Sequence, residues 1–373
     1  MRRTTTARAA VVTAGAALAL GLLPAAGPAH AASPTRSGAA APGVVLGSPG
    51  VLVRAAGVRT YTVDLILVRS TSGKRNRATL ASLKAGVRAT DAYYSRATGG
   101  LVRFAVGRTK SWSRSSIACS PTVTSRIARK LGWKGSSRRL VLGYQAQTCG
   151  FAGVAQVGGR YSLLVKGAGT VAMAHELGHN LGLWHSSLSR CSLAFTKLCS
   201  ATTDARRAVE YGDATDLMGG AETQGSSRRF VVRTVSGTLN PRHMARLGIP
   251  VPTTRVDLAG LTDPVTVTLR ARVDRAGWNA ASFVWGGRTF WLSYLKGTGR
   301  TDPLQGQVPW AFPPAKGQVV VHGSLGGRSV LVPPTRSTTA GPGFGDGAVR
   351  RVAGRVMRVA VLGDTATVTF SRT

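Results

Sequence analysis

In the first half of the chain, the hydrophobic pattern alternates between buried strands and amphipathic helices. Residues 60–69, TYTVDLILVR, are rich in aliphatic and β-branched side chains and predict a buried strand. Residues 78–100 carry apolar side chains at helical spacing and end at a glycine pair, as helix C-termini often do. Further strands are expected at 101–106, 138–144 and 160–165, and a further helix at 121–133. Strands that alternate with helices predict an α/β (α+β) arrangement for this half.

After about residue 250 the pattern changes to short alternating strands that are separated by turn residues. Segments such as VTVTLRARV, RTFWLSYL and VMRVAVLG have the period of two that half-buried strands show. Residues 239–250 predict a last helix, and Pro250 marks the boundary. We therefore predict an all-β, sandwich-like C-terminal domain over 250–373.

The N-terminal residues have the composition of a secretory signal peptide. A basic start is followed by the apolar run VVTAGAALALGLLPAA, and Ala29-His30-Ala31 supplies the small residues of a cleavage site. The predicted organisation is a signal peptide at 1–31, a linker or short pro-segment at 32–54, an α/β domain at 55–249 and the C-terminal β domain. This predicts a secreted, extracellular protein, and no later apolar stretch is long enough to predict a membrane span.

Four cysteines follow the predicted cleavage site: Cys119, Cys149, Cys191 and Cys199. An even number of cysteines in an exported chain favours two disulfides. Three pairings are possible. We favour Cys119–Cys149 with Cys191–Cys199, which closes two loops in sequence order. Thiolate metal ligands are disfavoured because no CxxC pair is present.

The charge of the chain is strongly positive, with 49 Lys and Arg against 14 Asp and Glu and a formal net charge of +35. A solvated, self-repelling surface and attraction to a polyanion are both compatible with this excess. An anionic cell-wall polymer is a candidate partner, which would make the protein cell-wall associated. No nucleic-acid-binding motif is present, so nucleic acid is not expected as a partner.

Half of the histidines of the chain are concentrated in HELGHNLGLWH, residues 175–185. The whole chain has six histidines, and three of them lie in this stretch. Residues 170–181 predict a helix with Thr170 as a plausible N-cap. His175 and His179 are then one turn apart on one face, so both imidazoles can bind the same metal ion. Glu176 lies beside them and is suited to accept a proton from a water on the metal and to pass it to a leaving amine.

Gly182 explains how a third histidine can join the first two. A helix that continued past this position would carry His185 away, but a glycine can adopt the left-handed conformation that ends the helix. His185 can then return as a third nitrogen ligand. Three protein ligands leave a fourth position open, which is the arrangement of one catalytic zinc ion rather than a structural one.

The motif HExxHxxGxxH, followed by a methionine-bearing turn, resembles the signature of the metzincin zinc metalloproteases. The turn is YGDATDLMGG, residues 211–220, with Met218 at its centre. Together with the later LNPRHMARLG, these motifs resemble most the gametolysin (autolysin) peptidase family, over roughly residues 55–250. The resemblance implies a metzincin-type catalytic domain at 55–249.

The resemblance also implies a role for each matched residue. His175, His179 and His185 would be the zinc ligands, Glu176 the general base, and Met218 the hydrophobic floor below the metal. The strand at 160–165 would form the upper rim of the cleft and pair with an extended protein or peptide substrate. No tyrosine follows Met218 at the spacing used by metzincins with a tyrosine ligand, so none is expected.

Other polar residues near these motifs have both a structural and a functional interpretation. Asp213 and Asp216 flank Met218 and can cap the turn, which we favour, or orient a histidine. Tyr211 can donate to a developing oxyanion, although packing is the favoured role. His243 and His322 are expected to be structural.

The function that these observations favour is a secreted, monomeric zinc endopeptidase that hydrolyses peptide bonds through a zinc-activated water with Glu176 as the general base. One alternative is a non-catalytic, cationic cell-wall-binding protein that retains its zinc site, against which the intact Glu176 argues. Another is a zinc hydrolase of cell-wall amide bonds. The motif and its methionine turn favour extended polypeptides instead.

Overall fold

The computed structural model describes thirteen segments of the chain, which are residues 57–70, 78–114, 119–120, 122–145, 149–165, 169–189, 208–213, 215–219, 239–272, 278–296, 317–325, 328–334 and 343–373. The predicted signal peptide and linker lie outside the described residues, and so do Cys191 and Cys199. All described segments belong to one compact unit, Val53–Thr373. The division into domains at residue 250 therefore stays a prediction.

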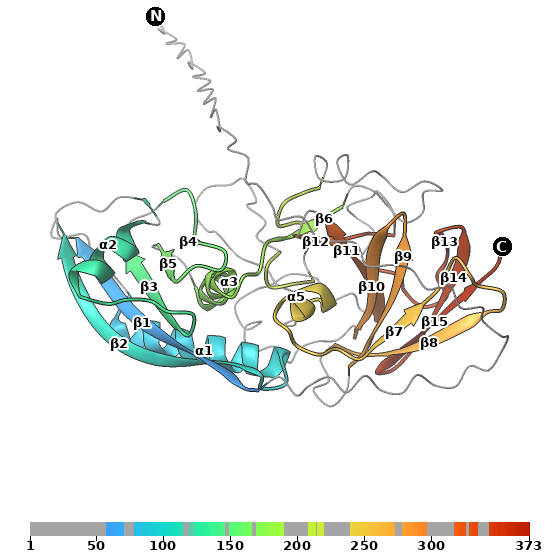
Figure 1. Ribbon diagram of the computed structural model, residues 1–373, viewed down its shortest axis with the longest axis horizontal. Helices are drawn as coiled ribbons and strands as arrows, with labels where there is room; N and C mark the ends of the chain where they lie inside the picture. The colour runs from blue at the N-terminus through green and yellow to red at the C-terminus, as the bar shows by residue number, and fades with distance from the viewer. Residues whose placement is uncertain are drawn as a thin grey trace, which may run out of the picture. The chain divides into compact units, whose positions relative to one another are not determined.

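The first half of the chain forms a five-stranded sheet with the order β2-β1-β3-β5-β4 (Figure 1). Its strands are β1 (Arg59–Ser70), β2 (Val102–Arg114), β3 (Arg139–Gln145), β4 (Gly153–Ala155) and β5 (Tyr161–Leu164). β2, β1, β3 and β5 are parallel, whereas β4 runs antiparallel to β5 at the end of the sheet. The parallel strands and their helices confirm the predicted α/β arrangement.

Helices cover both faces of this sheet. Alternate side chains of β1 point to opposite faces and therefore pack against different helices. Val63, Leu65 and Leu67 pack in one cluster with α1 (Leu80–Ala97) and α3 (Thr170–Asn180). Ile66 and Val68 pack on the other face with α2 (Thr122–Lys130). The fully buried run predicted for this strand thus results from a helix on each side.

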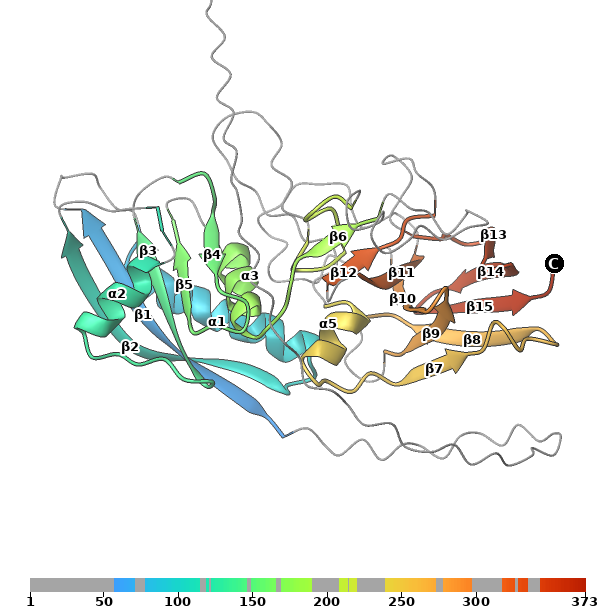
Figure 2. The ribbon, with the colours of Figure 1, turned by 45° about the horizontal axis from the view of Figure 1, so that its top comes forward.

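The C-terminal half is built from two sheets, whose strands are labelled in Figure 2. The four-stranded sheet has the order β13-β14-β15-β8, and the six-stranded sheet has the order β6-β12-β11-β10-β9-β7. Their side chains share one hydrophobic cluster, which includes Leu269 of β8, Phe283 of β9 and Phe370 of β15. The strands are β6 (Ser186–Leu188), β7 (Thr253–Val256), β8 (Val265–Arg270), β9 (Ala280–Trp285), β10 (Arg288–Leu295), β11 (Gln318–Leu325), β12 (Arg328–Leu331), β13 (Val349–Val352), β14 (Arg355–Leu362) and β15 (Thr365–Ser371).

Three features differ from the sequence-based expectation. β2 continues to Arg114 instead of ending at residue 106, because its polar second half still pairs with β1 at the sheet edge. β4 and β6 were not expected, since strands of three residues leave no periodic signal. β6 pairs in parallel with β12, so a strand from the first half of the chain completes the large C-terminal sheet. Within the described ranges, no helix is both long and apolar enough to span a membrane.

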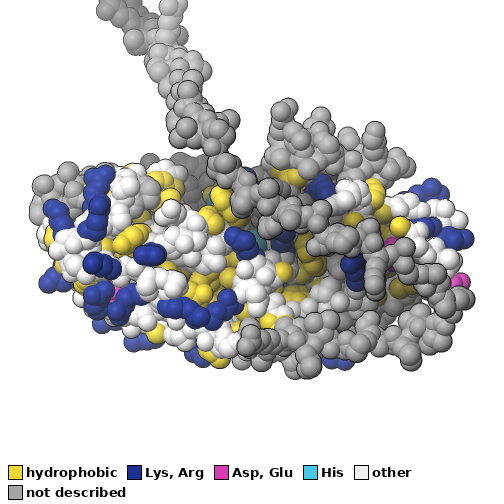
Figure 3. Space-filling model, viewed as in Figure 1, with side chains coloured by type: hydrophobic (Ala, Val, Ile, Leu, Met, Phe, Trp, Pro, Cys, Tyr) yellow, Lys and Arg dark blue, Asp and Glu magenta, His cyan; other side chains and the backbone are white. Residues whose placement is uncertain are grey.

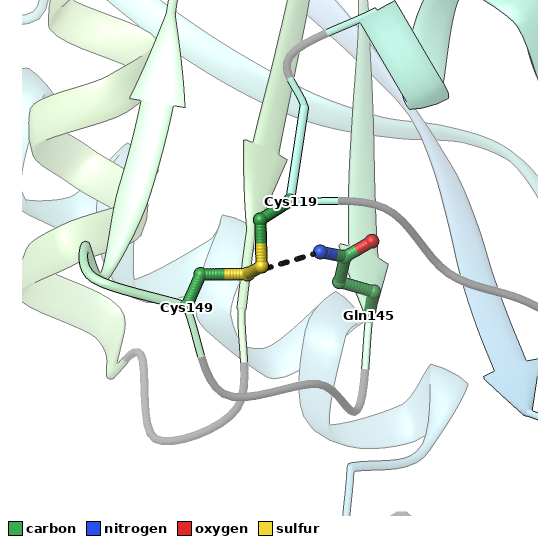
Figure 4. The surroundings of a disulfide bond; sticks show 3 residues. All are labelled: Cys119, Gln145 and Cys149. Carbon is green, nitrogen blue, oxygen red and sulfur yellow. Dashed lines mark hydrogen bonds between the residues drawn. A yellow bond between two sulfur atoms is a disulfide. The ribbon is translucent and has the colours of Figure 1, made fainter.

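A disulfide joins Cys119 to Cys149, with Cα atoms 5.8 Å apart (Figure 4). This is the pairing that the sequence favoured for these two residues. Gln145, at the end of β3, donates a hydrogen bond from Nε2 to Sγ of Cys149 at 3.4 Å. The disulfide therefore ties the segment before α2 to the segment that enters β4.

Candidate metal centre

Helix α3 carries two of the predicted ligands and is buried along nearly its whole length. The imidazole rings of His175 and His179 lie on the same face, with centroids 4.8 Å apart. The predicted N-cap, Thr170, was wrong by one position. Gly169 is the N-cap, with an extended backbone and no side-chain hydrogen bond, and Thr170 already lies in the first helical turn.

The helix ends in the Schellman arrangement, which turns the chain back toward the first two ligands. Gly182 has a φ of 92° and its N–H donates to the carbonyl of His179, while the N–H of Leu183 donates to Gly178. This confirms the predicted left-handed Gly182. His185 follows directly, and its ring centroid lies 4.7 Å from that of His179 and 5.5 Å from that of His175.

Each of the three imidazoles is held through Nδ1 by an oxygen from a different segment. Nδ1 of His175 bonds the carbonyl of Leu217 at 3.0 Å, and Nδ1 of His179 bonds the carbonyl of Leu183 at 2.8 Å. Nδ1 of His185 bonds Oε1 of Glu210 at 2.7 Å. Because these oxygens accept a hydrogen bond, Nδ1 carries the proton in each ring and Nε2 keeps its lone pair.

The segment around Met218 lies directly below these ligands. A Cβ added to Gly178, between the two ligands of α3, would lie 2.6 Å from Sδ of Met218 and 2.6 Å from the hydroxyl of Tyr94. Tyr94 of α1 also donates to the carbonyl of Ala174 at 3.0 Å. A glycine at position 178 is therefore needed for Met218 to approach the helix.

Two buried aspartates organise the turn that presents Met218. Oδ2 of Asp213 accepts from the hydroxyl of Ser186 at 2.6 Å and also lies 3.0 Å from Nε2 of His322, while Oδ1 accepts from the hydroxyl of Thr215 at 2.7 Å. These contacts, chiefly the charge of the histidine, hold the pKa of Asp213 below its usual range against the opposing effect of burial.

Asp216 makes the corresponding contacts on the other side of the turn. Its carboxylate accepts from the backbone N–H of Met218 at 2.8 Å and from that of Asn240 at 2.6 Å. Nδ1 of His243, in α5 (Pro241–Arg246), lies 2.9 Å away. Asp213, Asp216, His243 and His322 are thus assembled in one buried network, which fits the turn-capping and structural roles favoured from the sequence.

Glu176 points toward the edge strand rather than into the network. A Cβ added to Gly153 of β4 would lie 2.7 Å from Oε1 of Glu176, so only a glycine leaves room for this carboxylate. Oε2 is buried and has no hydrogen-bond partner among the described residues. Burial raises the pKa of Glu176 to about 8. A carboxyl with a raised pKa beside a histidine cluster is suited to proton transfer.

The position of Glu176 also corrects the predicted rim of the cleft. The strand expected there, 160–165, is β5, and β5 has partners on both sides, β3 and β4. It therefore has no free edge for another strand. β4, which was not predicted, is the terminal strand of the described sheet and the one that Glu176 contacts.

The three histidines are neutral at pH 7. Burial, and to a smaller extent the charge of His179, lowers the pKa of His175 to about 3. Burial lowers the pKa of His179 to about 4 and also lowers that of His185, against the opposing hydrogen bond to Glu210. Neutral imidazole is the form that binds a metal ion.

The cluster fits a zinc ion in its chemistry. The ligand atoms of His175, His179 and His185 all lie within 4.8 Å of one another. Two nitrogens that bind one zinc at about 2.0–2.1 Å are at most about 4.2 Å apart, so a small side-chain adjustment is sufficient. The anchored Nδ1 atoms and the unpartnered carboxylate of Glu176 support the same interpretation.

The surroundings of His185 include Tyr211, for which the sequence favoured a packing role, and two residues that the sequence did not single out. The ring of Tyr211 packs against that of His185 at a tilt of 43°, with centroids 3.9 Å apart, and Tyr211 has a φ of 61°. Burial raises the pKa of Tyr211 to about 12. Glu210, which holds Nδ1, and Arg328, from β12, also lie here. Only the stretch before the methionine turn could have indicated Glu210, and no sequence signal indicated Arg328.

Comparisons with known proteins give distant structural likenesses. No family model and no curated protein matches the sequence. Mature mirolysin of Tannerella forsythia, solved in complex with a cleaved peptide, is 14% identical with a TM-score of 0.28, and the match covers 35% of this chain and 65% of mirolysin. Archaemetzincin of Methanopyrus kandleri is 16% identical with a TM-score of 0.29, over 52% of this chain and 95% of that one.

A third solved structure is catalytically inactive OgpA of Akkermansia muciniphila in complex with an O-glycopeptide substrate. It is 11% identical with a TM-score of 0.30, over 84% of this chain and 93% of that one. At these identities and TM-scores, none of the three likenesses identifies the fold or the activity of this chain. What the chain itself provides is a group of three histidines with the geometry of a metal site.

Proposed function

We propose that this chain is a zinc-dependent endopeptidase with His175, His179 and His185 as the metal ligands and Glu176 as the general base. The observation that carries the proposal is the convergence of three Nδ1-anchored imidazoles beside a buried, unpartnered carboxylate. One open ligand position in such a site is typical of catalytic rather than structural zinc. A zinc ion held for structure alone would not require the carboxylate of Glu176 beside it.

The residues divide the work of peptide hydrolysis among them. Zinc, when bound, would polarise the scissile carbonyl and lower the pKa of water. Glu176 accepts the proton that is released and returns it to the leaving amine. β4, the terminal strand of the described sheet, offers its edge to an extended substrate, so that main-chain hydrogen bonds place the scissile bond next to Glu176. Met218 supports the ligands from below, as in metzincins.

Several wider features belong to the same proposal. The motifs HELGHNLGLWH and DATDLMG support a metzincin, most like the gametolysin family, that is exported by the signal peptide and acts as a monomer. We expect the two C-terminal sheets to form a β-sandwich and Cys191 to pair with Cys199. The net charge of +35 supports an extracellular location on an anionic cell wall.

The test is to map cleavage sites in a denatured protein mixture by mass spectrometry, with zinc measured in each sample. The mature chain is compared with Glu176→Ala. We expect the wild type to cut, the variant to be inactive, and both to hold about one zinc. If both bind zinc and neither cuts any protein, purified cell-wall material becomes the next substrate and the endopeptidase proposal is wrong.

A further inference from the structure

An arginine of the C-terminal sheet lies beside the third metal ligand. In the parallel pair of β6 and β12, Ser329 is opposite Ser186, so the preceding residues, Arg328 and His185, are neighbours across the pair. The guanidinium carbon of Arg328 lies 5.5 Å from the ring centre of Trp184. Trp184 is 41% exposed although it stands inside the zinc-binding motif. Arg328 is exposed as well.

Two further arginines stand around the same segment. Nε of Arg242 donates to the carbonyl of Arg328 at 3.0 Å, which fixes the backbone that carries Arg328. Nε of Arg246 lies 3.4 Å from the carbonyl of Gly182. Both come from α5. Arg328 and Arg246 therefore border the segment from Gly182 to His185, and Arg242, whose guanidinium carbon lies 6.0 Å from the ring centre of Trp291, contacts the backbone of Arg328.

These charges exceed the acidic charge near them in the described part of the chain. None of the three arginines forms an ion pair there, and the nearby exposed carboxylate of Glu210 hydrogen-bonds His185 instead. Asp213 and Asp216 are fully buried and paired with histidines. Figure 3 shows the same imbalance over one face of the molecule, where Lys and Arg side chains are numerous and Asp and Glu side chains are few. Three guanidinium groups against one exposed carboxylate beside a candidate active site favour an anionic ligand.

We propose that Arg328, supported by Arg242 and Arg246, forms a carboxylate-binding subsite beside His185, so that peptides with an acidic group at one fixed position are preferred substrates. This inference rests on the proposed endopeptidase function. Trp184 lies near the guanidinium of Arg328, and an aromatic face in this position leaves the in-plane N–H groups free to bind a carboxylate with two parallel hydrogen bonds. Arg328 belongs to β12, a strand from the C-terminal half of the chain that pairs with β6. The C-terminal sheet would therefore contribute directly to substrate selection.

The carboxylate can come from an Asp or Glu side chain or from the C-terminus of the substrate. A peptide set distinguishes these sources. One series carries a single Glu at successive positions and is compared with the same series carrying Gln. A second series ends in either a free acid or an amide.

The variants are Arg328→Gln, which removes the charge and keeps a polar side chain, and Arg328→Glu, which reverses the charge. The matched control is Arg129→Glu, because Arg129 is exposed in the last turn of α2, on the sheet face opposite α3. Bound zinc and the thermal midpoint are measured for each protein to show that the fold is kept.

We expect the wild type to cleave the best Glu peptide at least about tenfold more efficiently than its Gln counterpart, mainly through KM. Both Arg328 variants should lose this preference, and Arg129→Glu should retain it. A free-acid effect without a side-chain effect would assign the subsite to the substrate terminus. The inference is overturned if the wild type cuts peptides without an acidic preference, or if Arg328→Glu keeps that preference.

Failure of the inference and failure of the proposed function are separated by a binding measurement. Fluorescence polarisation of the labelled Glu and Gln peptides is recorded with zinc-loaded Glu176→Ala, with and without Arg328→Glu. If the wild type cuts nothing but Arg328 still determines binding of the Glu peptide, the endopeptidase function is wrong and the subsite stands. If neither cleavage nor binding depends on Arg328, the subsite does not exist.

Discussion

The candidate metal centre has two halves that are positioned in different ways. His175, Glu176 and His179 lie on one buried helix, and their relative placement follows from the helical repeat. His185 lies after the helix, and contacts from distant segments hold it. It precedes β6, which pairs with β12, and its Nδ1 bonds Glu210. The first half is local in sequence and the second is not.

This difference shows that the third ligand depends on the C-terminal half of the chain. The N–H of Ser186 donates to the carbonyl of Met218 at 2.8 Å, and its hydroxyl donates to Asp213. Asp213 in turn is paired with His322 of β11. Asn240 donates to Ser329 at 2.9 Å and so ties the start of α5 to β12. The sheet after residue 250 is part of the support of the site.

The largest expected effect follows from removing that sheet. A shortened chain of residues 55–250 keeps every residue of the zinc motif but leaves β6 without β12 and Asp213 without His322. We expect it neither to unfold cooperatively nor to retain zinc, as measured by near-ultraviolet circular dichroism and by metal content per chain. A shortened chain that holds one zinc and cuts protein would show that the two halves of the site are equally local.

The contrast between the halves also separates what the sequence could predict from what it could not. The ligands on α3 and the left-handed Gly182 have local signatures, namely a spacing of four and a glycine after a helix. Glu210 and Arg328 have none, because their contacts to the motif result from strand pairing across long separations. The sequence does not predict the edge strand β4, because a strand of three residues is too short to show a hydrophobic period. It predicts the longer, more apolar β5 as the rim of the cleft instead.

A smaller break in the non-local half is His322→Ala. It leaves the buried carboxylate of Asp213 without its histidine partner, although Ser186 and Thr215 still donate to it. We expect the free energy of unfolding to fall by about 3 kcal/mol, measured by urea denaturation of the metal-free protein. His175 and His179 do not contact this pair, so their geometry should remain. An unchanged unfolding free energy would rule out the pair as a support.

In the local half, Gly153→Ala tests the placement of Glu176. The new Cβ would meet the carboxylate at 2.7 Å, and displacement of that side chain should reduce peptide cleavage by about tenfold or more while zinc stays bound. The matched control is Gly150→Ala, where a Cβ meets nothing within 4 Å. Equal activity of the two variants would argue that Glu176 does not work from its position against β4.

Glu210→Gln sharpens the comparison at a single ligand. The amide keeps the size of the side chain but weakens the hydrogen bond to Nδ1 of His185. We expect zinc affinity to fall by roughly 10–100-fold, measured by competition with a chelator, because ligand-orienting carboxylates contribute on this scale. No equivalent substitution exists for His175 and His179, because backbone carbonyls hold their Nδ1 atoms. Unaltered affinity would mean that β6 alone positions His185.

The smallest expected effect is the dependence of metal-free stability on pH, which isolates the helical half. The pKa of Glu176 is raised by folding to about 8, so its contribution to stability is complete below about pH 4.3 and is lost as the pH rises toward 8. The pKa values of His175 and His179 are lowered to about 3 and about 4, so their contribution is complete above about pH 6.5 and is lost as the pH falls.

The two effects oppose each other and give a maximum. Between about pH 4.5 and 6.5 the three histidines, whose pKa values are all lowered, outweigh one carboxyl, so the free energy of unfolding rises with pH. Above about pH 6.5 the contributions of the histidines level off and that of Glu176 dominates among these groups, and stability should fall by up to roughly 2 kcal/mol before pH 8. Glu176→Gln should remove this fall and leave the rise below it, because the histidines are unchanged. Urea unfolding of both metal-free proteins at pH 5, 6.5 and 8 measures the difference directly, since every other titrating group is common to the two chains. Parallel profiles above pH 6.5 would mean that Glu176 is solvated in the folded protein, and the close contact with β4 would then not exclude water.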